Sequence, residues 1–209
     1  MSYESVEQNT EAWRLARAGK VTASRVADVV AKGRAKGSWG QAREKYMAQL
    51  IAERLTGMPA ENFYSVAAQW GHDHEEEALS AYSLMTDVDV ARIGFVTHPR
   101  VANAGASPDA LVGGDGLAQV KCPAPHTHIA TVMRGEIDPA YVTQMQWELS
   151  STDRLWCDYV SYDPRLPPDL RLFVKRVGRD QERIDYLEAR VREFNEEVEA
   201  MIAAMREAV

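Results

Sequence analysis

The segment 107–121 places the strongest constraint on the fold. Two short strand-like runs, 109–113 (DALVG) and 117–121 (LAQVK), flank the turn sequence Gly113-Gly114-Asp115-Gly116. A glycine-rich turn between two apolar runs predicts a β-hairpin. Alternate residues of a strand point to one face. We therefore expect Gln119 and Lys121 to project together, with Asp109 beside them across the hairpin.

Further strands and helices surround this hairpin. Runs rich in β-branched and aromatic residues predict strands at 92–97, 155–161 and 171–177. Apolar residues at helical intervals predict helices over 22–32, 40–56, 65–85 and 138–151. Thr22 or Ser24 is a candidate cap for the first, and Gly57 with Pro59 ends the second. Asp138 followed by Pro139 begins the fourth.

The C-terminal segment, about 180–208, predicts one long amphipathic helix. Its apolar side chains recur at steps of three and four residues: Ile184, Leu187, Val191, Phe194, Val198, Met201 and Met205. We expect this helix to pack against the sheet or a neighbouring subunit. No repeat or long linker divides the 209 residues, so we expect one domain, 1–209, of class α/β: a central mixed β-sheet flanked by helices.

Composition restricts the cellular setting. The 45% hydrophobic and 26% charged residues are typical of a soluble globular protein, and the apolar runs are too short to span a bilayer. The N-terminal residues lack the basic and apolar regions of a secretory signal. Two cysteines suggest no disulfide framework. We therefore expect a cytoplasmic protein with no membrane partner.

Charge is unevenly distributed along the chain. Residues 14–45 carry nine basic and two acidic side chains, a balance of +7, which leaves −14 on the rest of a chain whose net charge is −7. A basic segment on an acidic body can bind a polyanion on one surface. A solvated helix face explains such a run equally well.

The hairpin and the preceding helix carry residues suited to phosphodiester hydrolysis. Carboxylate oxygens such as those of Asp109 and Glu75 are ligands that Mg²⁺ prefers. Where two ions are used, they stabilise the attacking and departing oxygens. A neighbouring lysine, here Lys121, can orient or deprotonate the attacking water and offset charge on the phosphate.

Histidine and cysteine residues suggest two other chemistries. His72 and His74 are two residues apart, so on a helix they point in different directions and cannot share zinc. His126 and His128 could ligate zinc if their segment were extended, but surface or DNA-facing side chains fit them better. Cys122 has no histidine partner fixed by spacing, and a small buried thiol is the favoured interpretation.

The order of motifs resembles a known family. Pro-Asp, a spacer, then an acidic residue, any residue and Lys is the signature of the PD-(D/E)xK nuclease superfamily, whose restriction-endonuclease-like core is expected here. The blocks AWRLARAGKVTASRVADVVAK, QWGHDHEEEAL, AGASPDALV, QVKCP, YVTQMQWEL and YDPR are similar to those of the lambda-exonuclease, or YqaJ-type, viral recombination nucleases (alkaline exonucleases). They cover roughly residues 11–165.

The resemblance implies roles for individual residues. Metal ligands would be Glu75, Asp109, residue 119 and the carbonyl of Val120, with Lys121 positioning the nucleophile. Residues implied at the DNA or its 5′-phosphate are Arg17, Ser24, Arg34, Ser107, Gln144 and Trp13. Arginine presents a planar fork to phosphate, and a hydroxyl near a helix N-terminus adds donors. For Trp13, an ordinary core position is an equally good interpretation.

The resemblance also implies an activity. Members of the family remove mononucleotides processively from the 5′ strand of duplex DNA, preferably from a phosphorylated 5′ end, and leave a 3′ single strand. That strand passes to a single-strand annealing protein for recombination. The expected assembly is a homotrimeric ring in a bacterial host, encoded by a phage or prophage. The expected cofactor is Mg²⁺, with two ions and Mn²⁺ as a substitute.

Position 119 departs from the family, because it carries Gln where a glutamate is expected. The amide has the shape of the acid without its charge, and its NH₂ cannot ligate a metal. We expect weaker metal binding and slower chemistry. Retention of Lys121, Asp109 and Glu75 favours an introduced change over natural decay. The alternatives are a catalytically idle DNA-end-binding protein and a PD-(D/E)xK endonuclease.

Overall fold

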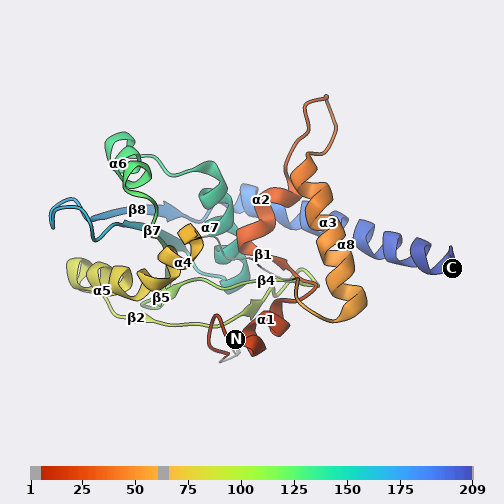
Figure 1. Cartoon of the computed structure of the whole chain (residues 1–209), viewed down its shortest axis with the longest axis horizontal. Helices are drawn as coiled ribbons and strands as arrows, with labels where there is room; N and C mark the ends of the chain where they lie inside the picture. Colours follow the sequence, from red (N-terminus) through yellow and green to blue (C-terminus); the bar gives the residue numbers. More distant parts are fainter. Residues whose placement is uncertain (1–5, 61–65, 209) are drawn as a thin grey trace.

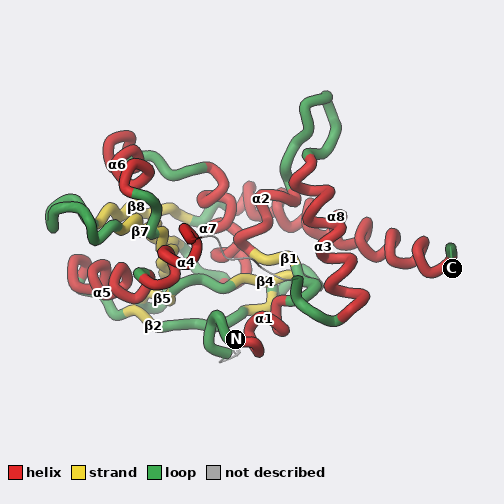
Figure 2. Tube along the Cα trace, viewed as in Figure 1, coloured by secondary structure: helices red, strands yellow, loops and turns green. Residues whose placement is uncertain are grey.

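The computed structural model describes residues 6–60 and 66–208, which form two sheets surrounded by helices (Figure 1; Figure 2). The larger sheet has the order β2–β5–β6–β7–β8. Its strands are β2 (Val90–Ala91), β5 (Ala110–Val112), β6 (Gly116–Lys121), β7 (Trp156–Tyr162) and β8 (Leu172–Gly178). β6 and β7 are parallel and the other neighbouring pairs are antiparallel. The predicted mixed sheet is confirmed.

The predicted hairpin is formed by β5 and β6. Ala110 pairs with Ala118 and Val112 with Gly116, so Asp109 comes opposite Gln119. The turn begins at Gly113, whose φ of 51° lies in the left-handed region that favours glycine. Gly116, which forms the last strand pair before the turn, is required for steric reasons. A Cβ at this position would lie 2.2 Å from the Trp156 ring.

The smaller sheet has the order β1–β4–β3, with β1 (Val21–Thr22), β4 (Ala104–Ala106) and β3 (Val96–Thr97). The predicted strand over 92–97 is therefore reduced to its last two residues. β4 was not predicted, since its sequence AGA has none of the β-branched or aromatic residues that mark a strand. Its small residues permit close packing: a Cβ on Gly105 would lie 2.4 Å from both the Phe95 ring and the Val96 carbonyl oxygen.

The helices end close to the predicted bounds where caps are strong. They are α1 (Glu11–Arg17), α2 (Val26–Val29), α3 (Gln41–Thr56), α4 (Val66–Asp73), α5 (Glu75–Thr86), α6 (Pro125–Arg134), α7 (Pro139–Thr152) and α8 (Gln181–Glu207), with the short 3₁₀ helix η1 (Ala23–Arg25). Gly57 ends α3 with φ of 69°, and the Asp138 carboxylate accepts from the Ala140 N–H to begin α7.

The helix predicted over 22–32 is wrong in extent. Val21 and Thr22 instead pair with β4, and only η1 and α2 follow in that range. Tertiary pairing of two β-branched residues overrides the local helical periodicity. Neither Thr22 nor Arg25, the residues that precede η1 and α2, forms a side-chain cap.

The helix predicted over 65–85 is interrupted. Residue 65 lies outside the described residues, and the remainder divides at His74 into α4 and α5. The His74 Nδ1 is 2.9 Å from the Trp70 carbonyl oxygen, and the two rings stack. The break places Glu75 in the first turn of α5, where a carboxylate interacts favourably with the helix dipole.

Helices cover both faces of the larger sheet. Leu79 and Tyr82 of α5 pack with Ala118 and Val120 of β6. Met145 of α7, on the opposite face, packs with Leu117 and other sheet residues in a separate cluster. Because alternate residues of β6 change face, Gln119 and Lys121 lie on the α7 side. The α/β class and the flanking helices are confirmed.

The C-terminal helix α8 differs in detail from its prediction. Ile184 packs over the sheet, and later apolar residues pack with α2, α3 and α7. Ile202 is the last buried position, whereas Met201 and Met205 are 49% and 51% exposed. The final turns project from the body of the molecule (Figure 1).

None of the helices in the described part of the chain combines the length and apolar character needed to cross a bilayer. That the whole chain, 1–209, is one domain stays a prediction.

Candidate active site

Asp109 is held at the start of β5 by donors from β6. Its Oδ2 accepts from the Val120 backbone N–H at 2.6 Å and from the Gln119 side-chain amide. The side chain is buried. Burial, and next the charge of Glu75, raise the pKa of Asp109 well above its ordinary range, while Lys121 opposes this shift. The two donors therefore fix the position of the carboxylate, while burial and the charge of Glu75 disfavour its ionised form.

Gln119 joins Asp109 to helix α7. Its Nε2 faces Asp109, and its Oε1 accepts from the Gln144 Nε2 at 2.9 Å. The Gln144 Nε2 also donates to the Glu148 Oε1 at 2.8 Å. The structure thus places Gln144 against Gln119, and its role at the site stays a prediction. Asp109, Gln119, Gln144 and Glu148 form one hydrogen-bonded series.

Glu148 was not identified from the sequence. It is fully buried, and its Oε2 has no hydrogen-bond partner among the described residues. Burial, and next the charge of Asp109, raise the pKa of Glu148 to about 8, against the Gln144 hydrogen bond and the charge of Lys121. An i, i+4 spacing from Gln144 on a buried helix was the available signal.

Glu75 approaches Asp109 from the other helix layer. Arg92, another residue that the sequence did not identify, pairs with the Glu75 Oε1 and also donates to the Asp109 backbone carbonyl at 3.3 Å. The Glu75 side chain is 22% exposed. Arg92 therefore links the Glu75 carboxylate to the backbone of Asp109, and the shared role of the two acids as metal ligands stays a prediction.

Lys121 lies on the same strand face as Gln119. Its Nζ is 5.1 Å from the centroid of the Tyr141 ring on α7, within range of a cation–π contact. Its charge acts on both Asp109 and Glu148. Val120 contributes its N–H to Asp109, and the role of its carbonyl as a ligand stays a prediction.

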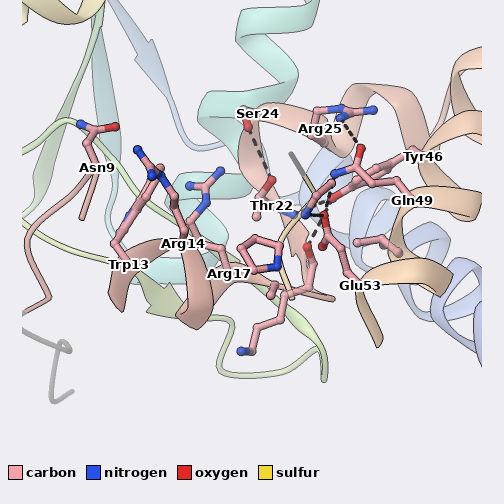
Figure 3. Close-up of a pocket in the computed structure, with 15 residues that line it drawn as sticks. Asn9, Trp13, Arg14, Arg17, Thr22, Ser24, Arg25, Tyr46, Gln49 and Glu53 are labelled. Carbon is pink, nitrogen blue, oxygen red and sulfur yellow. Dashed lines mark hydrogen bonds between the residues drawn. The ribbon is translucent and has the colours of Figure 1, made fainter. Parts of the chain in front are cut away.

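A basic pocket of about 320 Å³ lies between the N-terminal segment and α3 (Figure 3). Trp13 and Arg17 line it, and both donate to the Ser107 hydroxyl, at 3.0 and 3.2 Å. The Arg17 guanidinium stacks on Trp13 at 4.0 Å. Trp13 is thus a pocket residue and not a core tryptophan. Ser107 is two residues from Asp109, so the pocket adjoins the acidic cluster.

Of the other predicted DNA-binding residues, Ser24 lies at the pocket and Arg34 does not. Ser24 lines the pocket, with its hydroxyl 3.5 Å from that of Thr22 (Figure 3). The helical segments there have three and four residues, so the expected contribution of a helix dipole is small. Arg34 is exposed on the loop between α2 and α3, which projects from the body of the molecule (Figure 1).

The rival chemistries find no support in the geometry. His128 is buried against Ser161 and Leu170, whereas His126 is exposed on the same helix. His72 contacts Asn9. Burial raises the pKa of the Cys122 thiol to about 12, which leaves too little thiolate for a nucleophile.

The donor set meets most of the needs of a divalent cation. Within residues 6–60 and 66–208, no group of three or more His, Cys, Asp and Glu side chains is arranged as a ready metal site. The glutamine at position 119 removes one acid from the expected group. The oxygen donors suit Mg²⁺, and a cation would relieve the repulsion of Asp109 by Glu75 and of Glu148 by Asp109. The chemistry of these donors therefore fits the cation, while in the structure Arg92 pairs with Glu75 and the Gln119 amide donates to Asp109.

Known proteins share this architecture. Residues 12–155 match the YqaJ-like viral recombinase domain. The crystal structure of an alkaline exonuclease from Laribacter hongkongensis is 44% identical, with 95% of this chain and 97% of that chain covered and a TM-score of 0.88. The complex of that exonuclease with dAMP gives the same identity and coverage and a TM-score of 0.89.

A phage-related exonuclease from Haemophilus somnus 129PT shares the fold, with a TM-score of 0.66 at 17% identity over 89% of this chain and 96% of that chain. A search of curated proteins gave no match. The matched domain spans more than half of the chain and contains both the acidic cluster and most of the basic pocket. The chain therefore belongs to the YqaJ-like viral recombinase family, with the mixed α/β fold of an alkaline exonuclease.

Proposed function

We propose that the chain is a cation-dependent exonuclease that degrades the 5′ strand of duplex DNA processively. It releases mononucleotides and leaves a 3′ single strand for recombination by strand annealing. One observation carries the proposal: Asp109, Gln119 and Lys121 converge on one side of the hairpin, next to a pocket whose Arg17 donates to Ser107. Family membership and the 44% identical alkaline exonuclease support a nuclease or recombination role.

The proposed chemistry divides between the two parts of the site. Asp109 and Glu75, with oxygen donors at positions 119 and 120, would hold Mg²⁺, with two ions expected and Mn²⁺ as a substitute. When bound, such ions stabilise negative charge on the reacting phosphate. Lys121 would orient the attacking water or take its proton, and its ammonium would offset phosphate charge.

The basic pocket would receive the 5′-phosphate. A guanidinium presents paired donors to phosphate oxygens, and the Trp13 ring and Ser107 hydroxyl restrict the orientation of Arg17. Ser24 is close enough to take part. Phosphate contacts carry no base information, so no sequence preference is proposed.

Processivity would come from enclosure of the duplex. We propose a homotrimeric ring of 23.3 kDa protomers, acting in the cytoplasm of a bacterial host on behalf of a phage or prophage. A single-strand annealing protein would receive the product. Arg34, on the projecting loop, would contact the entering duplex end.

The amide at position 119 would weaken cation binding and slow the digestion of DNA without abolishing it. In the structure Gln119 presents its NH₂ to Asp109, so its oxygen would have to turn to reach a cation shared with that carboxylate. We propose that the chain digests DNA more slowly than its Gln119→Glu variant.

The test compares the parent protein with Asp109→Asn on linear and closed circular duplex in Mg²⁺, with each strand labelled. We expect release of mononucleotides from the 5′ strand of linear DNA. The Asp109→Asn rate should fall by at least about a hundredfold, because a cation contributes several kcal/mol, while duplex binding in EDTA persists. Asp115→Asn, an exposed carboxylate in the same hairpin, is the control and should digest normally.

The outcomes separate the alternatives. Cleavage of closed circles would indicate an endonuclease, because an exonuclease requires an end. DNA-end binding with no digestion by either the parent or Gln119→Glu would indicate an idle end-binding protein. Either result would refute the proposed activity.

A further inference from the structure

The buried carboxylate of Glu148 calls for an explanation. It lies at the centre of α7 and is fully buried. Its Oε1 accepts from Gln144, but its Oε2 has no partner among residues 6–60 and 66–208, and no Lys, Arg or His of that part forms an ion pair with it. Burial of a carboxyl group that forms no ion pair and has one oxygen without a hydrogen-bond partner is unfavourable. Stability of the fold alone therefore gives no reason for an acid here.

Its position relates it to the cluster on the hairpin. Helix α7 covers the face of β6 from which Gln119 and Lys121 project. Residues four apart lie on the same side of a helix, so Gln144 and Glu148 face the strand together. The Gln144 amide nitrogen contacts both the Gln119 oxygen, at 2.9 Å, and the Glu148 oxygen, at 2.8 Å. Glu148 is thus one side chain removed from the position where an acid is missing.

We propose that Glu148 supplies the carboxylate that position 119 lacks and helps to hold the divalent cation beside Asp109. This inference rests on the proposed nuclease function and names an additional cation-ligating residue for it. The unpartnered Oε2 is the ligating atom, and Gln144 positions the carboxylate through its other oxygen.

The amide at position 119 and the acid at position 148 are consistent with each other. A glutamate at position 119 would place a second carboxylate against Asp109, whose Oδ2 now accepts from the Gln119 amide, and the two carboxylates would repel each other. The glutamine found there satisfies Asp109 and links through Gln144 to an acid on α7. The total number of acids available to a cation is the same as in a site with a glutamate at position 119 and an uncharged residue at position 148.

A structural role makes a different prediction. If Glu148 served only as a neutral buried acid, an isosteric amide would replace it and cation binding would not change. The test is a set of variants at the two positions: parent, Glu148→Gln, Gln119→Glu, and the double variant. The measurement is Mn²⁺ affinity by calorimetry without DNA, followed by digestion of linear duplex.

The pattern of losses decides the matter. Glu148→Gln should weaken Mn²⁺ binding by at least about tenfold, the effect of losing a group that shapes a metal site. Gln119→Glu should restore binding in the Glu148→Gln background by a similar factor. In the parent background it should gain no more than about threefold, because one acid already serves. Rates of digestion should follow the same order.

Controls separate this inference from the function on which it rests. Glu188→Gln removes a buried carboxylate that is paired with Arg100 and Arg192, and should leave Mn²⁺ affinity unchanged. Circular dichroism in EDTA checks folding, and Glu148→Met, of similar size, replaces any unfolded Glu148→Gln variant. A parent that binds no Mn²⁺, or a Glu148 variant within about threefold of the parent, would overturn the inference. If Asp109→Asn also binds Mn²⁺ normally, the proposed function itself fails.

Discussion

At the scale of single residues, one atom exchange alters the chemistry of the hairpin. Gln119 has the shape of the expected glutamate, yet it donates to Asp109 where a glutamate would repel it. The amide thereby avoids repulsion between two neighbouring carboxylates when no cation is bound. We propose that the amide weakens cation binding and that the nearby Glu148 offsets this loss.

Arg17 is the residue whose role is most easily isolated. Arg17→Ala removes the guanidinium that stacks on Trp13 and donates to Ser107 at the pocket. We expect digestion of 5′-phosphorylated duplex to fall by at least about tenfold, the effect of one charge-assisted hydrogen bond of roughly 1.5 kcal/mol or more. Duplex with a 5′-hydroxyl end should lose less.

The comparison requires a charge-matched control. Lys45→Ala removes an exposed positive charge from α3, outside the pocket lining, and should affect both ends equally. Equal losses on the two substrates in Arg17→Ala would show that Arg17 does not bind the terminal phosphate.

Residue identities were predictable where a motif marked them. The Pro-Asp step, the Gln-Val-Lys strand and the hairpin turn suffice to bring Asp109, Gln119 and Lys121 together. Glu148 was missed because it stands within an apolar helix sequence, where a single acid resembles a solvated position. Arg92 was missed because its partners, Glu75 and the Asp109 carbonyl, depend on how two separate elements meet.

At the scale of elements, α7 serves the core and the site together. Trp147 and Met145 are fully buried in two different clusters, while Gln144 and Glu148 face the hairpin. Nearly every residue from 143 to 152 is buried. Movement of this helix would therefore change both packing and the spacing of the acids, which ties the geometry of the site to the stability of the core.

A buried histidine links β3 to α7 and gives a pH dependence. The His98 Nδ1 accepts from the backbone N–H groups of Arg100 and Val101, each at 3.1 Å, so its Nε2 carries the proton and donates to Ser150. Burial lowers the pKa of His98 to about 4. Protons therefore bind the unfolded chain more strongly, and stability is lost as pH falls from 6.5 toward 4.

The expected effect is measurable against a variant. Between pH 7 and pH 5, the parent should lose about 2 kcal/mol more unfolding free energy than His98→Gln, which cannot titrate. Urea denaturation in EDTA measures the difference. His126→Gln, at an exposed histidine, should match the parent, and parallel pH profiles for parent and His98→Gln would contradict the assigned ionisation.

Long helices with clear capping residues, and the hairpin with its glycine-rich turn, could be predicted from the sequence. The hairpin, α3, α7 and α8 follow from periodicity, a left-handed Gly57 and the Asp138-Pro139 start. The strands β1 and β4 were not predictable, because two or three residues carry no periodicity and their pairing joins segments about eighty residues apart. The break at His74 depends on a contact with Trp70 that hydrophobic spacing does not encode.

At the scale of the whole molecule, some basic residues of the segment 14–45 pack in the structure and others line the basic pocket. Arg43 is buried and pairs with Glu197 on α8. Four others, Arg14, Arg17, Lys20 and Arg25, line the pocket. The solvated-face interpretation of this segment is therefore incomplete. A positive pocket on a body of net negative charge would direct a polyanion to one place, as the proposed function requires.

The central claim is that Asp109 and Glu75, aided by oxygen donors from β6 and α7, gather a divalent cation next to Lys121. The most direct measurement is an anomalous difference map from crystals grown with Mn²⁺ and a 5′-phosphorylated duplex. We expect a Mn²⁺ peak in contact with the Asp109 carboxylate, and a DNA phosphate between the ion and Lys121. A map in which Mn²⁺ binds elsewhere, or in which the phosphate lies away from Asp109, would contradict the central claim.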